Sequence, residues 1–61
     1  MKKLKELRKE KKLTRQYVAK KLCISVDALR MYEGGWRTPP LHMAIKIAKF
    51  YEKSVEEIFD E

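Results

Sequence analysis

The amino-acid sequence predicts an all-α protein of five short helices, folded as a single domain over residues 1–61. Apolar residues recur three or four positions apart in several segments, as they do on one face of a helix. Side chains that cap helices, or prolines, precede these segments, and no segment predicts a strand. A chain of 61 residues with 44% hydrophobic residues is sufficient for one small packed core.

The first helix is predicted over residues 2–11, where Leu4 and Leu7 share one face and lysines cover the others. Leu13 is expected to point inward from the connection that follows. Thr14 is a good N-cap for the second helix, because its hydroxyl can accept a hydrogen bond from a free backbone N–H. One side of this second helix is apolar and consists of Val18, Ala19 and Leu22.

The third helix is predicted from Val26 to Glu33, with Ser25 as its N-cap. Leu29 and Tyr32 are expected to be buried. The helix is expected to stop at the following Gly-Gly pair, where a left-handed C-cap costs little. Its outer face mixes apolar, acidic and basic groups in a pattern that folding alone does not require.

The fourth helix is predicted over about residues 41–51, since Pro39 and Pro40 forbid a helix through them and favour one directly after. It is apolar on most of its circumference and is expected to be the central core helix. One apolar stripe consists of Leu41, Ala44, Ile45, Ala48 and Tyr51, and a second consists of Met43, Ile47 and Phe50.

A short fifth helix is predicted after Ser54. Ser54 and Glu57 fit the capping box S-x-x-E, in which each side chain accepts a hydrogen bond from the other residue's backbone N–H. Three apolar residues follow Ser54 within this last helix, namely Val55, Ile58 and Phe59. The sequence contains no internal repeat and no low-complexity tract, so it predicts no second domain.

The net charge of +6 is unevenly distributed along the chain. Residues 1–40 contain twelve Lys or Arg and four Asp or Glu, a net charge of +8, whereas residues 41–61 contain three and five, a net charge of −2. This asymmetry indicates an anionic partner for the first part of the domain. A lysine-rich surface that only keeps a small protein soluble explains the same charges, and charge alone does not decide between the two.

Several classes of function are not expected. The single cysteine cannot form an internal disulfide and suits a reducing compartment. The basic N-terminus is not followed by the apolar segment of a signal peptide, and no stretch is long enough to span a membrane. His42 has no second ligand in the pattern and is expected to be a surface residue. We therefore expect a cytoplasmic protein that is not an enzyme and has no metal, cofactor or small-molecule ligand.

The segment R-Q-Y-V-A-K-K-L-C-I-S-V-D-A-L-R-M-Y-E-G predicts two short helices joined by a tight turn at Cys23 and Ile24. With the flanking segments L-R-K-E-K-K-L-T, Y-E-G-G-W-R-T-P and S-V-E-E-I-F, it resembles the Cro/repressor-type helix-turn-helix family of phage repressors and small bacterial regulators. The resemblance runs from Leu4 to Phe59. It implies a five-helix lambda-repressor-like fold in which helices two and three form the helix-turn-helix.

The chain departs from the family pattern at several positions. Cys23 and Glu52 stand where the family commonly has glycine, and Gly34 stands where it has asparagine. Arg15 replaces the usual glutamine at the start of the second helix, and Trp36 occupies a position that is often basic. If the turn keeps a positive φ at Cys23, the backbone there is strained by roughly 1 kcal/mol.

The resemblance implies that the protein binds double-stranded DNA. In this family the second helix of the motif enters the major groove, and the first lies over the DNA backbone. Four residues are then candidate phosphate contacts, because they lie at the start of the second helix or just after the third: Arg15, Gln16, Tyr17 and Arg37. For each of them, an ordinary solvated side chain is the alternative.

Base reading is assigned to the exposed start of the third helix, which consists of Ser25, Val26, Asp27, Ala28, Arg30 and Met31. Arg30 can bind a guanine edge through two hydrogen bonds or can hold a phosphate. Val26 and Ala28 can pack on a thymine methyl. Asp27 can accept a hydrogen bond from cytosine, or it can be an acid favoured by the helix dipole alone.

Two further assignments concern structure. Arg8 and Glu33 resemble a family ion pair that links the first helix to the end of the third. Trp36 has three alternatives, which the sequence does not rank: stacking on the DNA sugar-phosphate, filling a dimer interface, or covering the core.

The resemblance also implies a homodimer on a two-fold related operator, because one short recognition helix touches few base pairs. Five apolar residues are candidates for the dimer interface: Met43, Phe50, Val55, Ile58 and Phe59. The competing interpretation is that Met43 and Phe50 enlarge the core of a monomer. The alternative function is a protein-interaction or antitoxin-like helix-turn-helix module with weak or no specific DNA readout.

Overall fold

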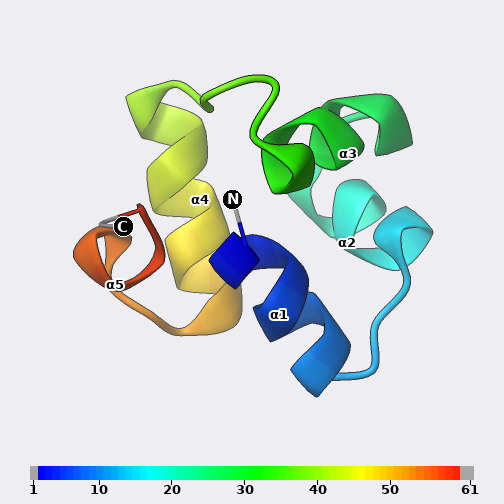
Figure 1. The fold of residues 1–61 in the computed structure, drawn as a ribbon, viewed down its shortest axis with the longest axis horizontal. Coiled ribbons are helices and arrows are strands. Elements are labelled where there is room, and N and C mark those ends of the chain that lie inside the picture. The colour runs from blue at the N-terminus through cyan, green and yellow to red at the C-terminus, as the bar shows by residue number, and fades with distance from the viewer. Residues whose placement is uncertain (1, 60–61) are drawn as a thin grey trace.

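Five helices and no strand make up residues 2–59, the part of the chain that the computed structural model describes (Figure 1). The order is α1 (Lys2–Glu10), α2 (Arg15–Leu22), α3 (Val26–Gly34), α4 (Leu41–Tyr51) and α5 (Val55–Phe59). The described chain measures 24 × 22 × 18 Å. The prediction of an all-α, five-helix fold is therefore confirmed.

The helices are arranged in two groups that share α1 (Figure 1). On one side of the molecule α2 packs against α3, and on the other α4 packs against α5. Helix α1 contacts both α3 and α5, and α2 also contacts α4. Helix α1 packs against α3 and α4 packs against α2 on the inner side of these two helices, so the other side of α2 and α3 faces outward.

The predicted N-caps of α2 and α3 are present. Thr14 Oγ1 accepts a hydrogen bond of 3.1 Å from the backbone N–H of Tyr17, and Ser25 Oγ accepts one of 3.0 Å from Ala28. Each bond satisfies a backbone donor that the first turn of a helix leaves without a partner. The starts of both helices of the motif are thus defined by neighbouring residues in the sequence.

Left-handed backbone conformations end three of the helices. Cys23, with φ of 59° and ψ of 40°, is the C-cap of α2, and Gly35, with φ of 79°, is the C-cap of α3. Glu52, with φ of 57°, ends α4 in the same way. A side chain with a Cβ costs about 1–2 kcal/mol in this region, so Cys23 and Glu52 are strained where glycine would not be.

The hydrophobic core lies where all five helices meet. Its centre is lined by residues that are almost fully buried: Leu4, Val18, Ala19, Leu22, Leu29, Tyr32, Ile47, Ala48, Tyr51 and Ile58. Seven partly buried residues pack around this centre: Leu7, Leu13, Ile24, Met43, Phe50, Val55 and Phe59. The expectation that α4 is a core helix is confirmed, since four of its eleven residues are buried.

The structure corrects one of the predicted apolar stripes of α4. Leu41 is 72% exposed and Ile45 is 39% exposed, although both belong to the stripe that was expected to face inward. The side of α4 that faces the core is instead formed by Ala44, Ile47, Ala48 and Tyr51. A domain of this size has too few elements to cover every side of one helix, and the N-terminal half of α4 remains open.

Candidate nucleic-acid interface

The turn between α2 and α3 brings the two helices of the motif close together. The backbone N–H of Cys23 donates to Lys20 O at 3.2 Å, and that of Ile24 donates to Ala19 O at 3.0 Å, which closes the last turn of α2. Ala19 is 1% exposed, and its small side chain permits the close approach of the two helices. This arrangement fixes the orientation of α3 on the surface.

The start of α3 presents an open surface. Val26 and Met31 are 37% and 38% exposed, Ser25, Asp27 and Arg30 are exposed, and Ala28 is half-buried. The opposite side of α3 is anchored by Leu29, Tyr32 and Glu33, which are buried. All six residues expected to read bases therefore keep part of their surface accessible in the N-cap and the first two turns of α3.

Asp27 and Arg30 form an ion pair on this exposed side. Arg30 Nη2 lies 3.4 Å from Asp27 Oδ1, and the two side chains are 60% and 85% exposed. An ion pair this open contributes little to stability, because water screens it. Both groups remain available to a ligand.

Helix α2 packs against α3, and its exposed basic residues, Lys20 and Lys21, lie in its last turn. Gln16 is exposed, and Tyr17 is 47% exposed. Lys21 Nζ lies 5.5 Å from the centre of the Tyr17 ring, one turn further along α2, in the range of a cation–π contact. Lys21 was not among the candidates predicted from the sequence, although its spacing of four residues from Tyr17 on a helix indicates that the two side chains are neighbours.

Arg15 lies partly within the protein. Its Nε donates to Glu33 Oε1 at 3.1 Å, and its side chain is 37% exposed. The second carboxylate oxygen of Glu33 accepts from Arg8 Nε at 2.7 Å, so the ion pair expected between Arg8 and Glu33 is present. Arg8 also donates to the backbone carbonyl of Leu13 at 3.1 Å. Glu33 thereby connects α1, the start of α2 and the end of α3.

Trp36 and Arg37 follow α3 and are exposed. The backbone N–H groups of both residues donate to Met31 O, at 3.0 and 3.3 Å, which holds the start of the linker against α3. A Cβ placed on Gly34 would lie 2.7 Å from Trp36 Cδ1, so the indole ring lies directly over this glycine. Trp36 is 81% exposed, and the alternative in which it covers the core is therefore wrong.

The residues expected at a dimer interface lie mostly against the core. Ile58 is 1% exposed and belongs to the centre of the core, so its assignment to an interface is wrong: the short helix α5 turns this side chain inward. Met43, Phe50, Val55 and Phe59 are partly buried and pack around the core. The largest exposed apolar groups outside α2 and α3 are instead Trp36, Leu41 and Ile45.

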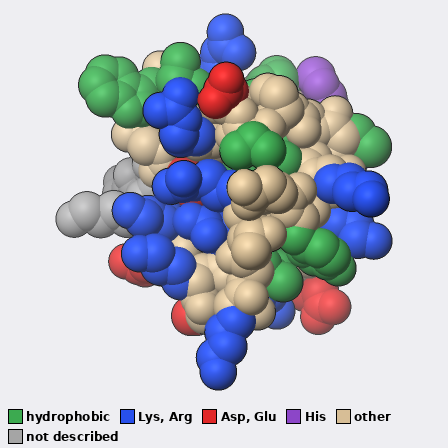
Figure 2. Space-filling model, turned by 90° about the vertical axis from the view of Figure 1, so that its right-hand side faces the viewer, with side chains coloured by type: hydrophobic (Ala, Val, Ile, Leu, Met, Phe, Trp, Pro, Cys, Tyr) green, Lys and Arg blue, Asp and Glu red, His purple; other side chains and the backbone are tan. Residues whose placement is uncertain are grey.

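Basic side chains gather on the side of the molecule that carries α2 and α3. Figure 2 shows this side, where Lys and Arg side chains flank patches of hydrophobic residues and acidic side chains lie mainly towards the margins. In α2 and α3 the exposed basic residues are Lys20, Lys21 and Arg30, and Asp27 is the exposed acid. Such a surface attracts phosphates while leaving apolar groups for contacts with bases and sugars.

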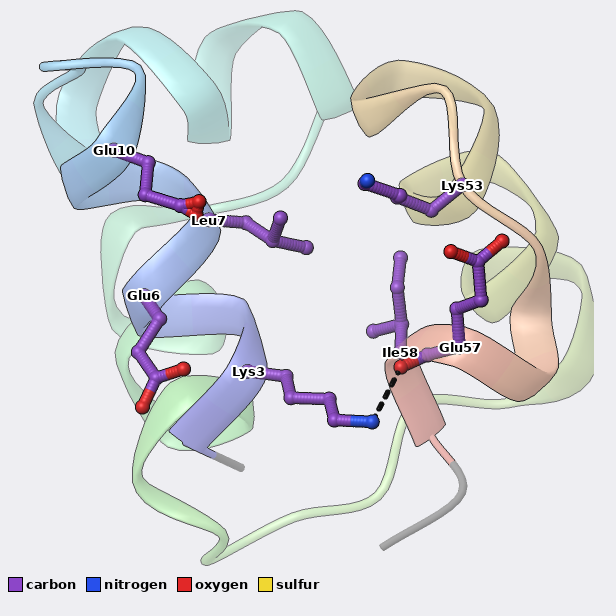
Figure 3. A pocket seen from close by; sticks show the side chains of 7 residues that line it. All are labelled: Lys3, Glu6, Leu7, Glu10, Lys53, Glu57 and Ile58. Atoms are coloured by element: carbon purple, nitrogen blue, oxygen red, sulfur yellow. Dashed lines mark hydrogen bonds between the residues drawn. The ribbon is translucent and has the colours of Figure 1, made fainter.

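A pocket of about 170 Å³ lies apart from this surface, between α1 and α5 (Figure 3). Its walls carry charges of both signs: Lys3, Glu6 and Glu10 lie on the α1 side, and Lys53 and Glu57 lie on the opposite side. Lys3 Nζ donates to the backbone carbonyl of Glu57 at 2.8 Å and so joins the two helices. Within residues 2–59 no group of three or more His, Cys, Asp or Glu is placed to hold a metal ion.

No helix in the described part of the chain has the length and apolar character needed to cross a membrane.

Tyr51 lies in the core and has a pKa raised to about 12. The chief cause is burial, which disfavours the charged phenolate, and the second is the negative charge of Glu33. The positive charge of Arg8 lowers the pKa and opposes both.

Comparison with known proteins agrees with this geometry. A helix-turn-helix family model matches residues 4–58. The chain is 42% identical over 57 residues to an uncharacterized helix-turn-helix-type transcriptional regulator of Methanocaldococcus jannaschii, an alignment that covers 93% of this chain and 86% of the relative. The match extends over nearly all five helices, and the motif lies at α2 and α3. The chain belongs to the Cro/repressor-type helix-turn-helix family of DNA-binding transcriptional regulators.

Proposed function

We propose that the protein is a sequence-specific regulator of transcription that binds duplex DNA with α3 in the major groove. The observation that carries this proposal is the exposed start of α3, where side chains of mixed chemistry lie on a helix packed against the basic helix α2. In this arrangement α2 crosses the DNA backbone while the N-terminal part of α3 reaches the base edges. The match to transcriptional regulators supports the same function.

Two sets of contacts follow from this docking. Arg15, Gln16, Tyr17 and Arg37 are proposed to contact phosphates, with Lys21 added to them because it lies beside Tyr17. These contacts position the protein and provide most of the salt-dependent affinity. The base-reading set consists of Ser25, Val26, Asp27, Ala28, Arg30 and Met31, among which Arg30 is assigned to a guanine edge.

The test of this function is selection of bound sequences from a random duplex pool, followed by titration of the selected duplex at several salt concentrations. We expect a defined consensus sequence and an affinity that falls with salt, with a slope of about −0.9 per phosphate contact. Failure to bind any duplex at low salt, or an affinity indifferent to salt, would remove the proposal.

We further propose that the protein works as a Cro-like repressor, as a homodimer on a two-fold related operator. Closed two-fold pairing is the commonest association of small proteins, and it doubles the number of base pairs that are read. Met43, Phe50, Val55 and Phe59 keep part of their apolar surface exposed, and Trp36, Leu41 and Ile45 add a second exposed apolar set. Both sets are proposed interface residues.

The dimer is tested by sedimentation and by the spacing of the half-sites. Two recognition helices related by a two-fold axis read half-sites centred about 10 base pairs apart. Inserting five base pairs between the half-sites should abolish cooperative binding, because one half-site then faces the opposite side of the duplex. A protein that sediments as a monomer at high concentration, and binds one-to-one regardless of the insertion, would contradict the dimer.

A second candidate function is a protein-interaction or antitoxin-like module without specific DNA readout. The exposure of Trp36 at 81% and Leu41 at 72% favours it, because aromatic and aliphatic groups this open are characteristic of protein interfaces. The selection from a random duplex pool separates the two functions. A protein-interaction module would give no consensus sequence, whereas a sequence-specific regulator would give a defined one.

A further inference from the structure

Glu33 is a buried carboxylate shared by two arginines. Its side chain is 2% exposed, with one oxygen 2.7 Å from Arg8 Nε and the other 3.1 Å from Arg15 Nε. The two guanidinium groups differ in accessibility, because the Arg8 side chain is 11% exposed and that of Arg15 is 37% exposed. The three groups together carry two positive charges and one negative charge, so the cluster has a surplus positive charge, and its open side is at Arg15.

A positively charged residue at the start of α2, where Arg15 lies, does not stabilise the helix itself. Arg15 is the first residue of α2, whose first turn contains no acid. The N-terminus of a helix carries partial positive charge, which disfavours a cation and favours an anion. The start of α2 thus combines an arginine with free backbone N–H groups, and Glu33 is the negative charge that keeps this arginine in place.

The geometry of a guanidinium explains how one arginine can serve two anions. Arginine carries five N–H donors in a rigid planar fork, whereas lysine ends in a single compact ammonium. Glu33 accepts a hydrogen bond from Nε of Arg15, and the two terminal nitrogens of the same rigid guanidinium can then donate to a second acceptor. A phosphate oxygen at the start of α2 would complete the charge balance of the cluster and would also meet the backbone N–H groups there.

We infer that Glu33 is a positioning residue for DNA binding: it holds Arg15 by Nε so that the terminal nitrogens are preorganised to bind a phosphodiester group of the DNA backbone. This inference rests on the proposed function. It assigns Glu33, a buried residue that touches no DNA, a part in affinity beyond its ion pair with Arg8. It also predicts that an arginine, and not a lysine, is needed at the start of α2 for full affinity.

The first experiment compares Arg15→Lys with the matched substitution Arg37→Lys in the full chain. Both variants keep the net charge, but the loss of one phosphate contact in Arg15→Lys should make the slope of affinity against salt shallower by about 0.9, whereas Arg37→Lys should leave it unchanged. Arg15→Lys should weaken binding to the selected duplex about tenfold, because an ammonium held by Glu33 cannot also reach the phosphate. Arg37 makes no hydrogen bond through its side chain in the described structure, so Arg37→Lys should change affinity less than about twofold.

The second experiment is a double-mutant cycle between Arg15 and Glu33. Arg15→Ala should weaken binding strongly in the unmodified chain and only slightly in the Glu33→Gln background, where Arg15 is no longer held. Thermal unfolding of each variant shows that it is folded at the temperature of the titration. If Glu33→Gln does not fold, the pair of lysine substitutions decides.

The outcomes separate the inference from the proposed function. Equal effects of Arg15→Lys and Arg37→Lys, or a loss from Arg15→Ala that is the same in both backgrounds, would show that Glu33 acts only on folding and would overturn the inference while DNA binding stands. Absence of binding by the unmodified chain would instead remove the proposed function.

Discussion

Arg30 and Asp27 lie one turn apart on the exposed side of α3, with Nη2 of the arginine 3.4 Å from Oδ1 of the aspartate. Both side chains are more than half exposed. Their mutual attraction is weak enough for a ligand to replace it. When DNA binds, Arg30 can exchange the carboxylate of Asp27 for the edge of a guanine, while Asp27 becomes free to accept a hydrogen bond from a cytosine.

Arg30→Ala is therefore expected to weaken binding to the preferred duplex by about 1–3 kcal/mol and to relax the preference at one base position. Titration of the selected duplex and of single-base variants measures both effects. Asp27→Ala is the matched control, since it removes the ion pair and keeps Arg30. If Arg30→Ala weakens every sequence alike, Arg30 holds a phosphate and its assignment to base readout is wrong.

Replacing the strained residues at two helix ends should stabilise the fold. Cys23→Gly and Glu52→Gly remove a Cβ from left-handed backbone, which relieves about 1–2 kcal/mol of strain, but glycine gives back part of this gain through the entropy of the unfolded chain. We expect each variant to raise the free energy of unfolding by up to about 1 kcal/mol in urea titrations.

Gly35→Ala is the opposite control, because it introduces a Cβ where φ is already 79°. It should destabilise the protein by a similar amount. Unchanged unfolding midpoints in all three variants would show that the left-handed caps carry no strain.

Tyr51 should make the stability of the protein depend on alkaline pH. Its pKa is about 12 in the folded protein and 10.0 in a free tyrosine, so the unfolded chain loses the phenolic proton first. The stability that this group contributes is complete below pH 10 and is lost as the pH rises towards 12. The full difference in pKa corresponds to about 2–3 kcal/mol.

Tyr51→Phe should remove this dependence. Urea unfolding of the variant and of the unmodified chain between about pH 9 and about pH 11, a range around the ordinary pKa of tyrosine, measures it. The Tyr51 hydroxyl is buried and has no hydrogen-bond partner among residues 2–59, so its removal should also raise the free energy of unfolding at neutral pH by about 1 kcal/mol. The control is Tyr17→Phe, which alters an exposed ring and should leave both quantities unchanged. A steeper loss of stability with pH in Tyr51→Phe would contradict this account.

The capping box of α5 should be sensitive to acid. The backbone N–H of Ser54 donates to Glu57 Oε1, and that of Glu57 donates to Ser54 Oγ, both at 3.1 Å. Hydrogen bonds from Ser54 to the Glu57 carboxylate, first from its backbone N–H and then from its side chain, lower the pKa of Glu57 below its ordinary value of 4.5. The stabilisation by Glu57 is therefore present above that value and is lost as the pH falls through the lowered pKa.

Glu57→Gln should make the order of α5 independent of pH in the acid range, as amide hydrogen exchange at α5 would show. Ser54→Ala should cost about 1 kcal/mol at neutral pH through loss of the cap. An acid dependence that persists unchanged in Glu57→Gln would assign it to another carboxylate.

Features set by residues that are close in the sequence could be predicted. Thr14, Ser25 and Ser54 cap their helices as expected, because each cap depends on a backbone N–H only three residues away. The bounds of α4 were predictable for a similar reason, since Pro40 stands directly before its first residue. The side chains available at the start of α3 also followed from the spacing of its buried residues.

Features that depend on distant parts of the chain could not be predicted from periodicity. Arg15 was expected to be an open phosphate contact, but Glu33, 18 residues further along, holds it. The helical spacing of α4 also does not predict that Lys46 Nζ donates to the backbone carbonyl of Leu22 at 2.8 Å and caps the end of α2. The exposure of Leu41 depends on which neighbours cover α4, and its own helical spacing does not contain that information.

The single cysteine of the chain lies in the turn between α2 and α3, and its side chain is exposed. The unmodified protein therefore already carries one addressable thiol beside the helix that is proposed to read DNA. A maleimide fluorophore or a nitroxide spin label attached to Cys23 would report on the approach of a duplex to α3, or on the distance between two copies on one operator. Such measurements need no engineered cysteine and no removal of competing thiols.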